Sequence, residues 1–288
     1  MTRTGEMVVP PRARFPPPAP VPIRSGSMAG QVHLEFGDRR ATIILDNPDR
    51  LNAISAEMWE GLTDATVRIS GHDDIRAVVI RGAGERAFAS GADISQFGES
   101  RADASANTAY DSATRRATEA LAGLPMPVVA SIHGYCIGGG LAVALTADLR
   151  IASHDAAFAI PAARLGLGYA ARGIAVLLDL VGPSATKEIF FTARRFDARR
   201  ALDMGLVNRV VERHDLDRAV DEMVDQICSN APLTLRAVKA AVSELLIEPP
   251  DRDLDRVDTM VRECFGSEDY AEGVAAFLEK RRPEFRGR

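Results

Sequence analysis

Cysteine is scarce in this chain of 288 residues, with only Cys136, Cys228 and Cys264 far apart and in no Cys-x-x-Cys arrangement. This odd number and wide spacing indicate neither a disulfide framework nor a zinc site, and they favour a reducing, cytoplasmic location. Long apolar runs are also lacking. Because no stretch approaches the roughly 18 residues that a spanning helix needs, no membrane partner is expected.

Excess positive charge is missing as well. The 35 Lys and Arg residues stand against 40 Asp and Glu residues, which gives a formal net charge of -5. This balance disfavours binding to a phosphate backbone, so nucleic acid is not an expected partner. A hydrophobic content of 46% and a charged content of 26% are typical of a globular protein with one large domain, or one domain with an appendage.

The first thirty residues differ from the rest, because they hold seven prolines and four arginines but one acid, Glu6. Proline at this density prevents both helices and the hydrogen-bond ladders of β-sheets, so residues 1–30 are expected to form a disordered tail. A transit peptide has a similar composition, but the run from Pro16 to Pro20 interrupts the amphipathic helix that such a signal needs. Met28 just before the first expected strand is an alternative start of translation.

Regular patterns begin at Gln31. Apolar residues alternate over 32–36 and return over 41–45 after a Gly-Asp turn, which predicts a hairpin. Ser55 is expected to cap a helix, and buried strands over 76–81 and 127–133 flank a helix over 104–124. From about Pro183 the pattern is helical, over 184–192, 197–204, 216–229, 233–246 and 254–280. The chain is therefore expected to be α/β, with a core over 31–210 and a helical C-terminal region over 211–288.

Two glycine-bearing turns are the most informative feature of the chain. Ser90-Gly91-Ala92-Asp93-Ile94 and Gly138-Gly139-Gly140-Leu141-Ala142 each follow an apolar strand-like run. Backbone N–H groups from two such turns can converge on one oxygen, which is the standard way to stabilise a developing oxyanion. The triplet alone, without the other motifs, favours a tight helix start packed closely on a sheet.

A second glycine motif suggests a different chemistry. The segment from Gly82 to Ala87 follows a strand and matches the G-x-G-x-x-A dinucleotide fingerprint. It runs into Phe88 and Gly91 without a helix start, and it comes after a hairpin and a helix, whereas the fingerprint belongs in the first βα turn of its domain. No nicotinamide or flavin cofactor is therefore expected.

The ordered set of motifs resembles the enoyl-CoA hydratase/isomerase (crotonase) superfamily from about Gln31 to Phe285. Each motif is weak alone, but their order is specific. The motifs that carry the resemblance are Asn47-Pro48 with Leu51-Asn52-Ala53, Ala87-Phe88 with Gly91-Ala92-Asp93-Ile94, Pro127-Val128-Val129-Ala130, Gly134-Tyr135, Gly138-Gly139-Gly140, Ala147-Asp148, Phe158, Leu165-Gly166, Ala201 with Gly205-Leu206-Val207, and Phe277-Leu278-Glu279-Lys280-Arg281.

The resemblance implies a spiral of ββα units with a helical C-terminal trimerisation region, assembled as a homotrimer or homohexamer. It also implies that the N–H groups of Ala92 and Gly139 hold the oxygen of an acyl-CoA thioester, with coenzyme A as part of the substrate and no separate cofactor or metal. The residues implied to bind the thioester are Leu51, Ala53, Ala89, Gly91, Ala92, Ile94, Gly138, Phe277 and Lys280.

The chain departs from the family at the catalytic carboxylates. Hydratases of the family carry two glutamates that activate water, and here those positions are Ala142 and Ala162. A methyl group cannot transfer a proton, and each such group contributes about 10²- to 10⁴-fold, so weak hydration is expected. Ala162 also removes the base of simple double-bond isomerases, and Ala170 stands at the aspartate position of dienoyl isomerases.

Tyr169 is the candidate replacement, because a similar Leu-Gly-x-x-Tyr-x-x-x-Gly-Ile stretch occurs in the family's methylmalonyl-CoA decarboxylases. A phenol can orient a carboxylate or donate a proton, or it can simply fill the pocket wall. Those decarboxylases have histidine at the position of Ala92. Three activities stay open: a hydratase/isomerase-type lyase, a decarboxylase using Tyr169, and a non-catalytic acyl-CoA-binding protein.

Other polar residues are expected to be structural. His133 and His154 lack a carboxylate partner at motif spacing, and Ser90 and Ser131 lack a neighbouring base. Arg172 fits either a carboxylate or phosphate ligand, or a subunit contact. The remaining two, Asp93 and Asp148, are expected to orient turns.

Overall fold

The computed structural model describes residues 30–93 and 104–288, with side chains in the first long helix of the second range from residue 108 onward. The expected tail at residues 1–30, apart from Gly30, lies outside the described residues. So do Met28 and Ile94.

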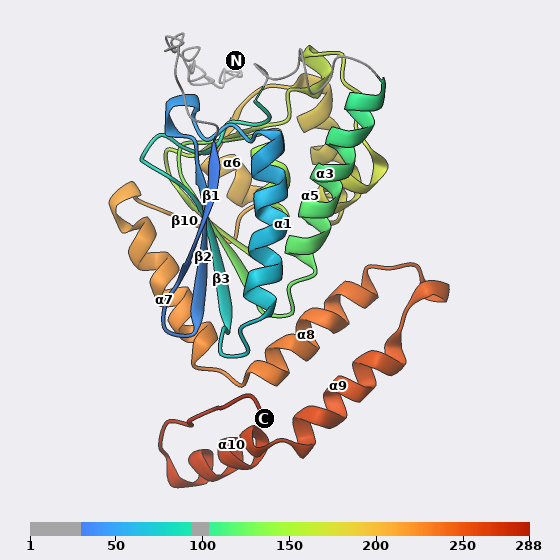
Figure 1. Ribbon diagram of the computed structural model, residues 1–288. Helices are drawn as coiled ribbons and strands as arrows, with labels where there is room; N and C mark the ends of the chain where they lie inside the picture. Colours follow the sequence, from blue (N-terminus) through green and yellow to red (C-terminus); the bar gives the residue numbers. More distant parts are fainter. Residues whose placement is uncertain (1–29, 94–103) are drawn as a thin grey trace, which may run out of the picture.

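A six-stranded sheet in the order β1-β2-β3-β5-β7-β10 forms the centre of the molecule (Figure 1). The expected hairpin is confirmed, because β1 (Gln31–Phe36) pairs antiparallel with β2 (Arg40–Asp46). The other pairs are parallel: β2 with β3 (Ala77–Gly82), β3 with β5 (Val128–Ile132), β5 with β7 (Leu149–Ser153) and β7 with β10 (Arg209–Val211).

A second sheet has the order β4-β6-β8-β9 and consists of short strands: β4 (Ala87–Ala89), β6 (Tyr135–Ile137), β8 (Ala157–Ala159) and β9 (Phe196–Asp197). Each of β3, β5 and β7 is followed along the chain by one strand of this second sheet. The sequence pattern missed these strands, because three residues are too few to show a period. They matter for function because the chain leaves β4 and β6 directly into the two glycine turns.

Helices cover both faces of the main sheet. Alternate residues of β3 face opposite ways, so Ala77 and Val79 pack against α7 (Leu216–Cys228), whereas Val78 and Ile80 belong to the larger core on the other side. That side carries α1 (Ala56–Ser70) and α3 (Ala104–Ala122) (Figure 1). The oxygen of Ser55 accepts from the Met58 N–H, as the predicted helix start requires.

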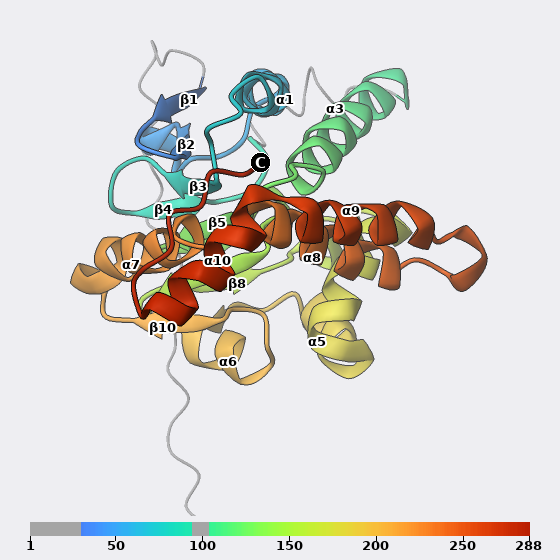
Figure 2. The ribbon, with the colours of Figure 1, turned by 90° about the horizontal axis from the view of Figure 1, so that it is seen from below.

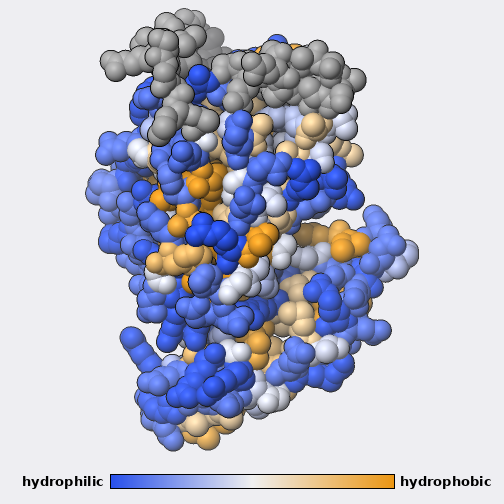
Figure 3. Space-filling view, in the orientation of Figure 1, coloured by the Kyte–Doolittle hydropathy of each residue, from blue (hydrophilic) through white to orange (hydrophobic). Residues whose placement is uncertain are grey.

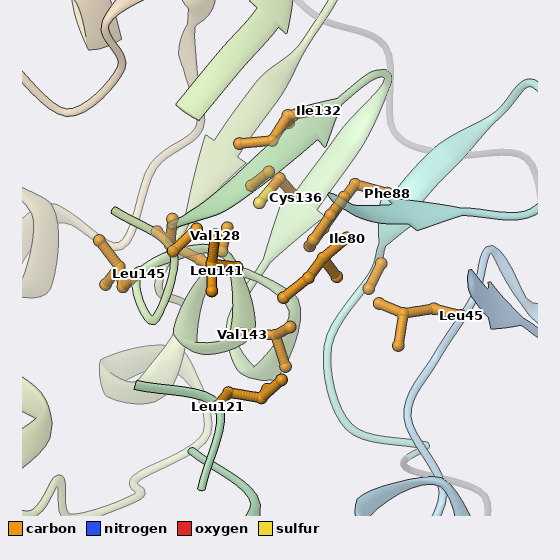
Figure 4. Packing of buried hydrophobic residues seen from close by; sticks show 14 of the residues in the cluster. Leu45, Ile80, Phe88, Leu121, Val128, Ile132, Cys136, Leu141, Val143 and Leu145 are labelled. Carbon is orange, nitrogen blue, oxygen red and sulfur yellow. The ribbon is translucent and has the colours of Figure 1, made fainter. Parts of the chain in front are cut away.

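Helix α4 (Gly139–Ala144) follows the glycine triplet and is anchored in the core. Leu141 and Val143 are fully buried and lie near Ile80 and Val128 of the main sheet (Figure 4). Leu and Val side chains buried in this way each stabilise the fold by about 1.5–3 kcal/mol. The position of the glycine turn is therefore fixed by the packing of the residues that follow it.

The C-terminal half differs from the prediction in two places. Helix α5 (Ala171–Thr192) begins next to Arg172, where a helix start was expected, but it continues through a kink at Gly182, whose φ is 75°, into the helix expected over 184–192. The single helix expected over 254–280 is wrong: α9 (Leu254–Gly266) ends before α10 (Glu268–Glu279) begins. Ser267 lies between them in an extended conformation and caps α10 by accepting from the Tyr270 N–H.

Residues 232–288 form an arm that we call the C-terminal arm. It contains α8 (Pro232–Leu245), α9 and α10, and it lies at the end of the molecule opposite the starts of α1 and α3 (Figures 1 and 2). The visible face of the molecule is mostly hydrophilic, with apolar patches over its middle and along the arm (Figure 3). The remaining elements are α6 (Ala198–Asp203) and four 3₁₀ turns at Pro48–Arg50, Ala162–Arg164, Arg213–Asp215 and Pro249–Asp251. None of the helices in the described ranges is long and apolar enough to cross a membrane.

Candidate active site

The two glycine turns contact each other, although 47 positions separate Ala92 from Gly139 in the sequence. A Cβ built on Gly139 would lie 3.5 Å from the Ala92 nitrogen, and one built on Gly91 would lie 3.9 Å from the Gly139 nitrogen. Gly91 and Gly138 have φ values of 114° and 50°, a region that favours glycine. The structure therefore brings together the two backbone N–H groups that the turns were expected to present.

These two N–H groups are free. Those of Ala92 and Gly139 donate no hydrogen bond to any residue within 30–93 and 104–288, whereas their neighbours do. The Gly138 N–H donates to Ala159 O at 2.9 Å, and the Asp93 N–H donates to Ile54 O at 3.0 Å. Ala92 and Gly139 are half-buried. Free donors at this depth are available to an oxygen of a bound molecule.

Gly140 holds the second turn tightly against β4. A Cβ on Gly140 would lie 2.2 Å from Ala89 O and 2.7 Å from the Ala89 Cβ. Gly140→Ala is therefore expected to lower the free energy of unfolding by about 1–3 kcal/mol, measured by urea denaturation. Gly168→Ala is the matched control, since no atom lies within 4 Å of its Cβ, and a change of less than about 0.5 kcal/mol is expected there. Equal stability of the two variants would contradict this packing.

The loop from Asn47 to Ile54 pairs with the first glycine turn. The Ser90 N–H donates to Leu51 O at 3.0 Å, and the Ile54 N–H donates to Gly91 O at 2.7 Å. Leu51 and Asn52 both have left-handed conformations, with φ values of 54° and 55°. Such backbone costs energy for a leucine and persists only where the surroundings enforce it. Leu51 and Ile54 are thus hydrogen-bonded to the first glycine turn, and Ala53 lies between them in the loop.

Two buried asparagines hold this loop in place. The Asn52 amide donates to Ala83 O and Ala87 O at 2.9 and 2.8 Å, and its oxygen accepts from the Asn47 N–H at 2.9 Å. The Asn47 amide donates in turn to Ala53 O. These bonds tie the loop to the residues between β3 and β4, including the segment that matches the dinucleotide fingerprint. No helix begins in that segment, so the fingerprint lacks its required geometry.

Asp93 links the same loop to the turn by charge. The Arg50 guanidinium donates to its carboxylate at 2.6 Å, and Asp93 is only 8% exposed. A charge-assisted bond at this depth fixes the turn that carries Ala92. Asp148 also holds structure, because it accepts from the Val128 N–H at 2.7 Å and pairs with Lys239 at 2.8 Å. Both aspartates thus have the orienting roles predicted for them.

Trp59 lies directly against Gly139 and was missed as a candidate site residue. Its Cζ2 is 3.4 Å from the position of a Cβ on Gly139, and its indole N–H donates to the Tyr110 hydroxyl at 2.9 Å. The pair connects α1 and α3 to the second turn. The only signal in the sequence is that this single tryptophan shares the apolar face of α1 with Leu62 and Ile69, at helical spacing.

Tyr169 has a buried ring and an available hydroxyl. The ring packs edge-on against Phe190 with 4.9 Å between centroids, and Cε1 lies 2.8 Å from the position of a Cβ on Gly173. Burial raises the pKa of the phenol, so it stays protonated near neutral pH. The hydroxyl has no hydrogen-bond partner among the described residues. These contacts place Tyr169 against α5, which begins two residues after it, where a helix start was expected at Arg172.

Ala142 is half-buried one turn after Gly139, and Ala162 is 8% exposed at the start of a 3₁₀ turn. Neither position offers a proton donor or acceptor. Ala89 is fully buried. Phe277 is 83% exposed, and Lys280 follows it at the end of α10 in a left-handed conformation with φ of 56°. Both lie on the C-terminal arm, away from the glycine turns of the same chain (Figure 1).

Three other polar candidates are engaged elsewhere. Arg172 pairs with Glu119 of α3 at 2.8 Å and is 84% exposed, so it does not face the glycine turns. His154 has no carboxylate partner at motif spacing, as the sequence indicated, but its Nδ1 lies 3.2 Å from Glu212, which is distant in sequence. The hydroxyl of Ser90 donates to Arg50 O at 3.2 Å. These contacts are structural.

His133 is buried, with its Nε2 unpartnered in the described part of the chain. Burial, aided by Arg213, lowers its pKa from 6.5 to about 4. As pH falls from 6.5 towards 4 the unfolded chain takes up a proton that the folded chain does not. The free energy of unfolding should therefore fall by roughly 2 kcal/mol between pH 7 and 5. The contribution of the neutral His133 to stability is fully present above pH 6.5.

Urea unfolding of the parent and His133→Gln at pH 7 and 5 measures this effect. The variant should lose less stability between these pH values than the parent does. His154→Gln is the control, because that imidazole is exposed. An unchanged pH dependence in His133→Gln would show that the His133 imidazole does not titrate as described.

The three cysteines are free, and no group of three or more potential metal ligands occurs among residues 30–93 and 104–288.

The family model described as enoyl-CoA hydratase/isomerase matches residues 37–288. This chain belongs to the enoyl-CoA hydratase/isomerase family. The expected resemblance is thereby confirmed over nearly the whole described chain.

Three relatives illustrate the family membership. The carnitinyl-CoA dehydratase of Proteus mirabilis is 36% identical over 265 residues, covering 91% of this chain and all of the relative. The short-chain-enoyl-CoA hydratase of Clostridium acetobutylicum is 33% identical over 253 residues, covering 88% of this chain and 96% of the relative. The crystal structure of an enoyl-CoA hydratase/carnithine racemase from Magnetospirillum magneticum has a TM-score of 0.84 at 37% identity. The match covers 91% of this chain and 97% of that protein. The α/β fold of this family is thus shared.

Proposed function

We propose that this member of the family acts on an acyl-CoA thioester and stabilises the thioester enolate with the backbone N–H groups of Ala92 and Gly139. The observation that carries the proposal is the contact between the two glycine turns, with both N–H groups free among the described residues. Loss of a proton or of CO₂ beside a thioester, or addition of water to its conjugated double bond, places negative charge on the thioester oxygen. Each preorganised donor then contributes roughly 3–4 kcal/mol.

The thioester is proposed to lie along the loop 51–53 and the turns at 89–94 and 138–139. The hydrogen bonds from the Ser90 N–H to Leu51 O and from the Ile54 N–H to Gly91 O support this, and the Asn47 and Asn52 amides fix the loop in that position. Coenzyme A is then part of the substrate, and the proposal needs no separate cofactor. The cytoplasm is the proposed location, to which the three free thiols are suited.

Decarboxylation is the second candidate, because it requires no general base: breaking the C–C bond delivers the enolate directly. The protonated, unpartnered hydroxyl of Tyr169 supports this reaction, since it can orient a carboxylate or protonate the enolate. Ala142 and Ala162 support it as well, because neither can activate water. The same two alanines fit a non-catalytic acyl-CoA-binding protein.

Turnover of crotonyl-CoA and of methylmalonyl-CoA, together with calorimetric binding of a saturated acyl-CoA, tests these candidates. We expect acyl-CoA binding, weak hydration, and decarboxylation that falls at least about tenfold in Tyr169→Phe. Tyr270→Phe is the control, because that tyrosine is exposed on α10. If acyl-CoA binds but neither substrate is turned over, the protein is a non-catalytic acyl-CoA-binding protein. Absence of acyl-CoA binding would contradict the proposal.

Assembly into a homotrimer or homohexamer, with the C-terminal region forming subunit contacts, is part of the proposal. It is supported by apolar side chains exposed on the C-terminal arm, among them Phe277 at 83%, Leu278 at 74% and Phe265 at 65%. In an assembly, Phe277 and Lys280 would border the CoA site of a neighbouring subunit. Light scattering should give three or six times the 31.0 kDa chain mass. A monomer at micromolar concentration would contradict it.

A further inference from the structure

Two adjoining cavities lie between the main sheet and the C-terminal arm, at the end of the molecule opposite the starts of α1 and α3. Their volumes are about 380 and 370 Å³, within the range of small-molecule pockets. Both are lined by Arg39, Arg76 and Arg286, and one is lined also by Arg236. Figure 2 shows the C-terminal segment returning to the side of β3 at this end.

The four arginines that line these cavities have no acidic partner. Within residues 30–93 and 104–288, none of them forms an ion pair, whereas Arg40, Arg281 and Arg288 nearby in the sequence all do. The Nε of Arg236 is shielded from solvent and has no hydrogen-bond partner in that part of the chain. Clustered guanidinium groups that lack ion-pair partners repel one another, so an anion between them would be favoured.

Arg76 is the most buried of the four at 9% exposure, and its position is fixed. It donates to Cys228 O at 2.9 Å and to Phe285 O, both of which are neutral carbonyls. Burial and the positive charge of Arg39 lower the pKa of Arg76. The site thus holds a desolvated cation that is hydrogen-bonded but not neutralised.

The acids near these cavities do not fill this role. Asp73, Asp74 and Glu284 contribute to the lining, but none lies within 4.0 Å of the four guanidinium groups. Asp269 accepts instead from the Arg286 and Gly287 N–H groups at 2.6 and 2.8 Å. These carboxylates reduce the positive potential of the cavities, but none of them forms an ion pair with the four guanidinium groups.

The start of α8 adds to the positive potential. Pro232, its first residue, lines one of the cavities, and Ala231 before it offers no side chain to cap the helix. Arg236 is one turn further along the same helix. The positive end of a 14-residue helix dipole therefore points to the place where the four arginines gather.

From this arrangement, we propose that the cavities lined by Arg39, Arg76, Arg236 and Arg286 bind the phosphate group of a small anion. Arginine suits phosphate because its planar group donates two parallel hydrogen bonds to the oxygens. The ligand would join two parts of the chain, since Arg39 and Arg76 precede strands of the main sheet and Arg236 and Arg286 belong to the C-terminal arm. Occupancy would stabilise the docking of the arm on the sheet.

The test is titration of the full-length protein with inorganic phosphate at constant ionic strength, followed by calorimetry and thermal unfolding. For the parent we expect saturable binding and a melting temperature that rises with phosphate. In Arg236→Gln and Arg286→Gln the dissociation constant for phosphate should rise by about tenfold or more. Arg199→Gln is the control, because this exposed arginine pairs with Asp203 on α6. It should bind phosphate like the parent.

Adenosine monophosphate, titrated in parallel, distinguishes the source of the phosphate. The site is supported if either anion binds saturably to the parent and both variants bind it more weakly. The anion with the lower dissociation constant shows whether the ligand is inorganic phosphate or an organic phosphate. Far-UV circular dichroism establishes that each variant is folded, and Arg286→Gln is the safer variant since that side chain is exposed. Absence of saturable binding of both anions, or equal binding in folded variants and parent, would overturn the proposal.

Discussion

Gly139→Pro is expected to lower kcat/KM for the thioester substrate by about 10²- to 10³-fold, because it removes one of the two proposed donors to the oxyanion. Gly139 is the first residue of α4, a position where proline is accepted, since its N–H has no partner within the helix. The substitution should therefore remove the donor while α4 still forms. The measurement is steady-state turnover of the substrate identified in the assays above.

Gly139→Ala is the matched control for this experiment. It also adds a Cβ, 3.4 Å from Trp59 Cζ2 and 3.5 Å from the Ala92 nitrogen, but it keeps the N–H. The difference between the alanine and proline variants thus isolates the donor from the added bulk. If both variants lost activity equally, crowding against Trp59 would explain the loss. If the proline variant bound and turned over substrate like the parent, the assignment of Gly139 would be wrong.

Restoring both carboxylates with Ala142→Glu and Ala162→Glu is expected to raise crotonyl-CoA hydration, which should be weak or undetectable in the natural protein. Two missing acid–base groups cost roughly 10⁴-fold or more, although such losses are rarely additive. The measurement is the loss of the conjugated thioester absorbance. Each single variant should recover much less than the pair, because water must be held between two carboxylates.

The unmodified protein provides the decisive comparison for this prediction. Ala162 is 8% exposed, so a glutamate there must displace neighbours, and a failed rescue has a steric cause as well as a chemical one. Ala142→Gln with Ala162→Gln is the control, since glutamine adds similar bulk without a carboxylate. A natural kcat/KM for hydration of about 10⁶ M⁻¹s⁻¹ would show that another residue performs the work of the glutamates.

Local patterns predicted those elements whose own residues carry the signal. The β1–β2 hairpin and α1 were found because alternation and the Ser55 cap lie within a few residues of one another. The short strands β4, β6 and β8 were missed because three residues are too few to show a period. The break at Ser267 was missed although serine followed by Glu268 and Asp269 is a helix-start signal, because the apolar spacing continues across it.

The candidate site was predictable only in part, for the same physical reason. The glycine turns and the resemblance identified Ala92 and Gly139, but their contact depends on the packing of β4 and β6 in one sheet. The Trp59–Tyr110 bond and the His154–Glu212 pair join residues that are 51 and 58 positions apart, and no local pattern encodes such distances. A helix start near Arg172 was predicted, but the packing of Tyr169 against Phe190 joins residues 21 positions apart and has no local signal.

The most direct test of the central claim is the vibrational spectrum of an acyl-CoA bound to the protein, with ¹³C at the thioester carbonyl. Two N–H donors polarise this carbonyl, so its stretching frequency should fall on binding to the parent. The shift should be smaller in Gly139→Pro, and Gly139→Ala should retain it. A carbonyl frequency that is the same in bound and free acyl-CoA would contradict the assignment of Ala92 and Gly139 as the donors.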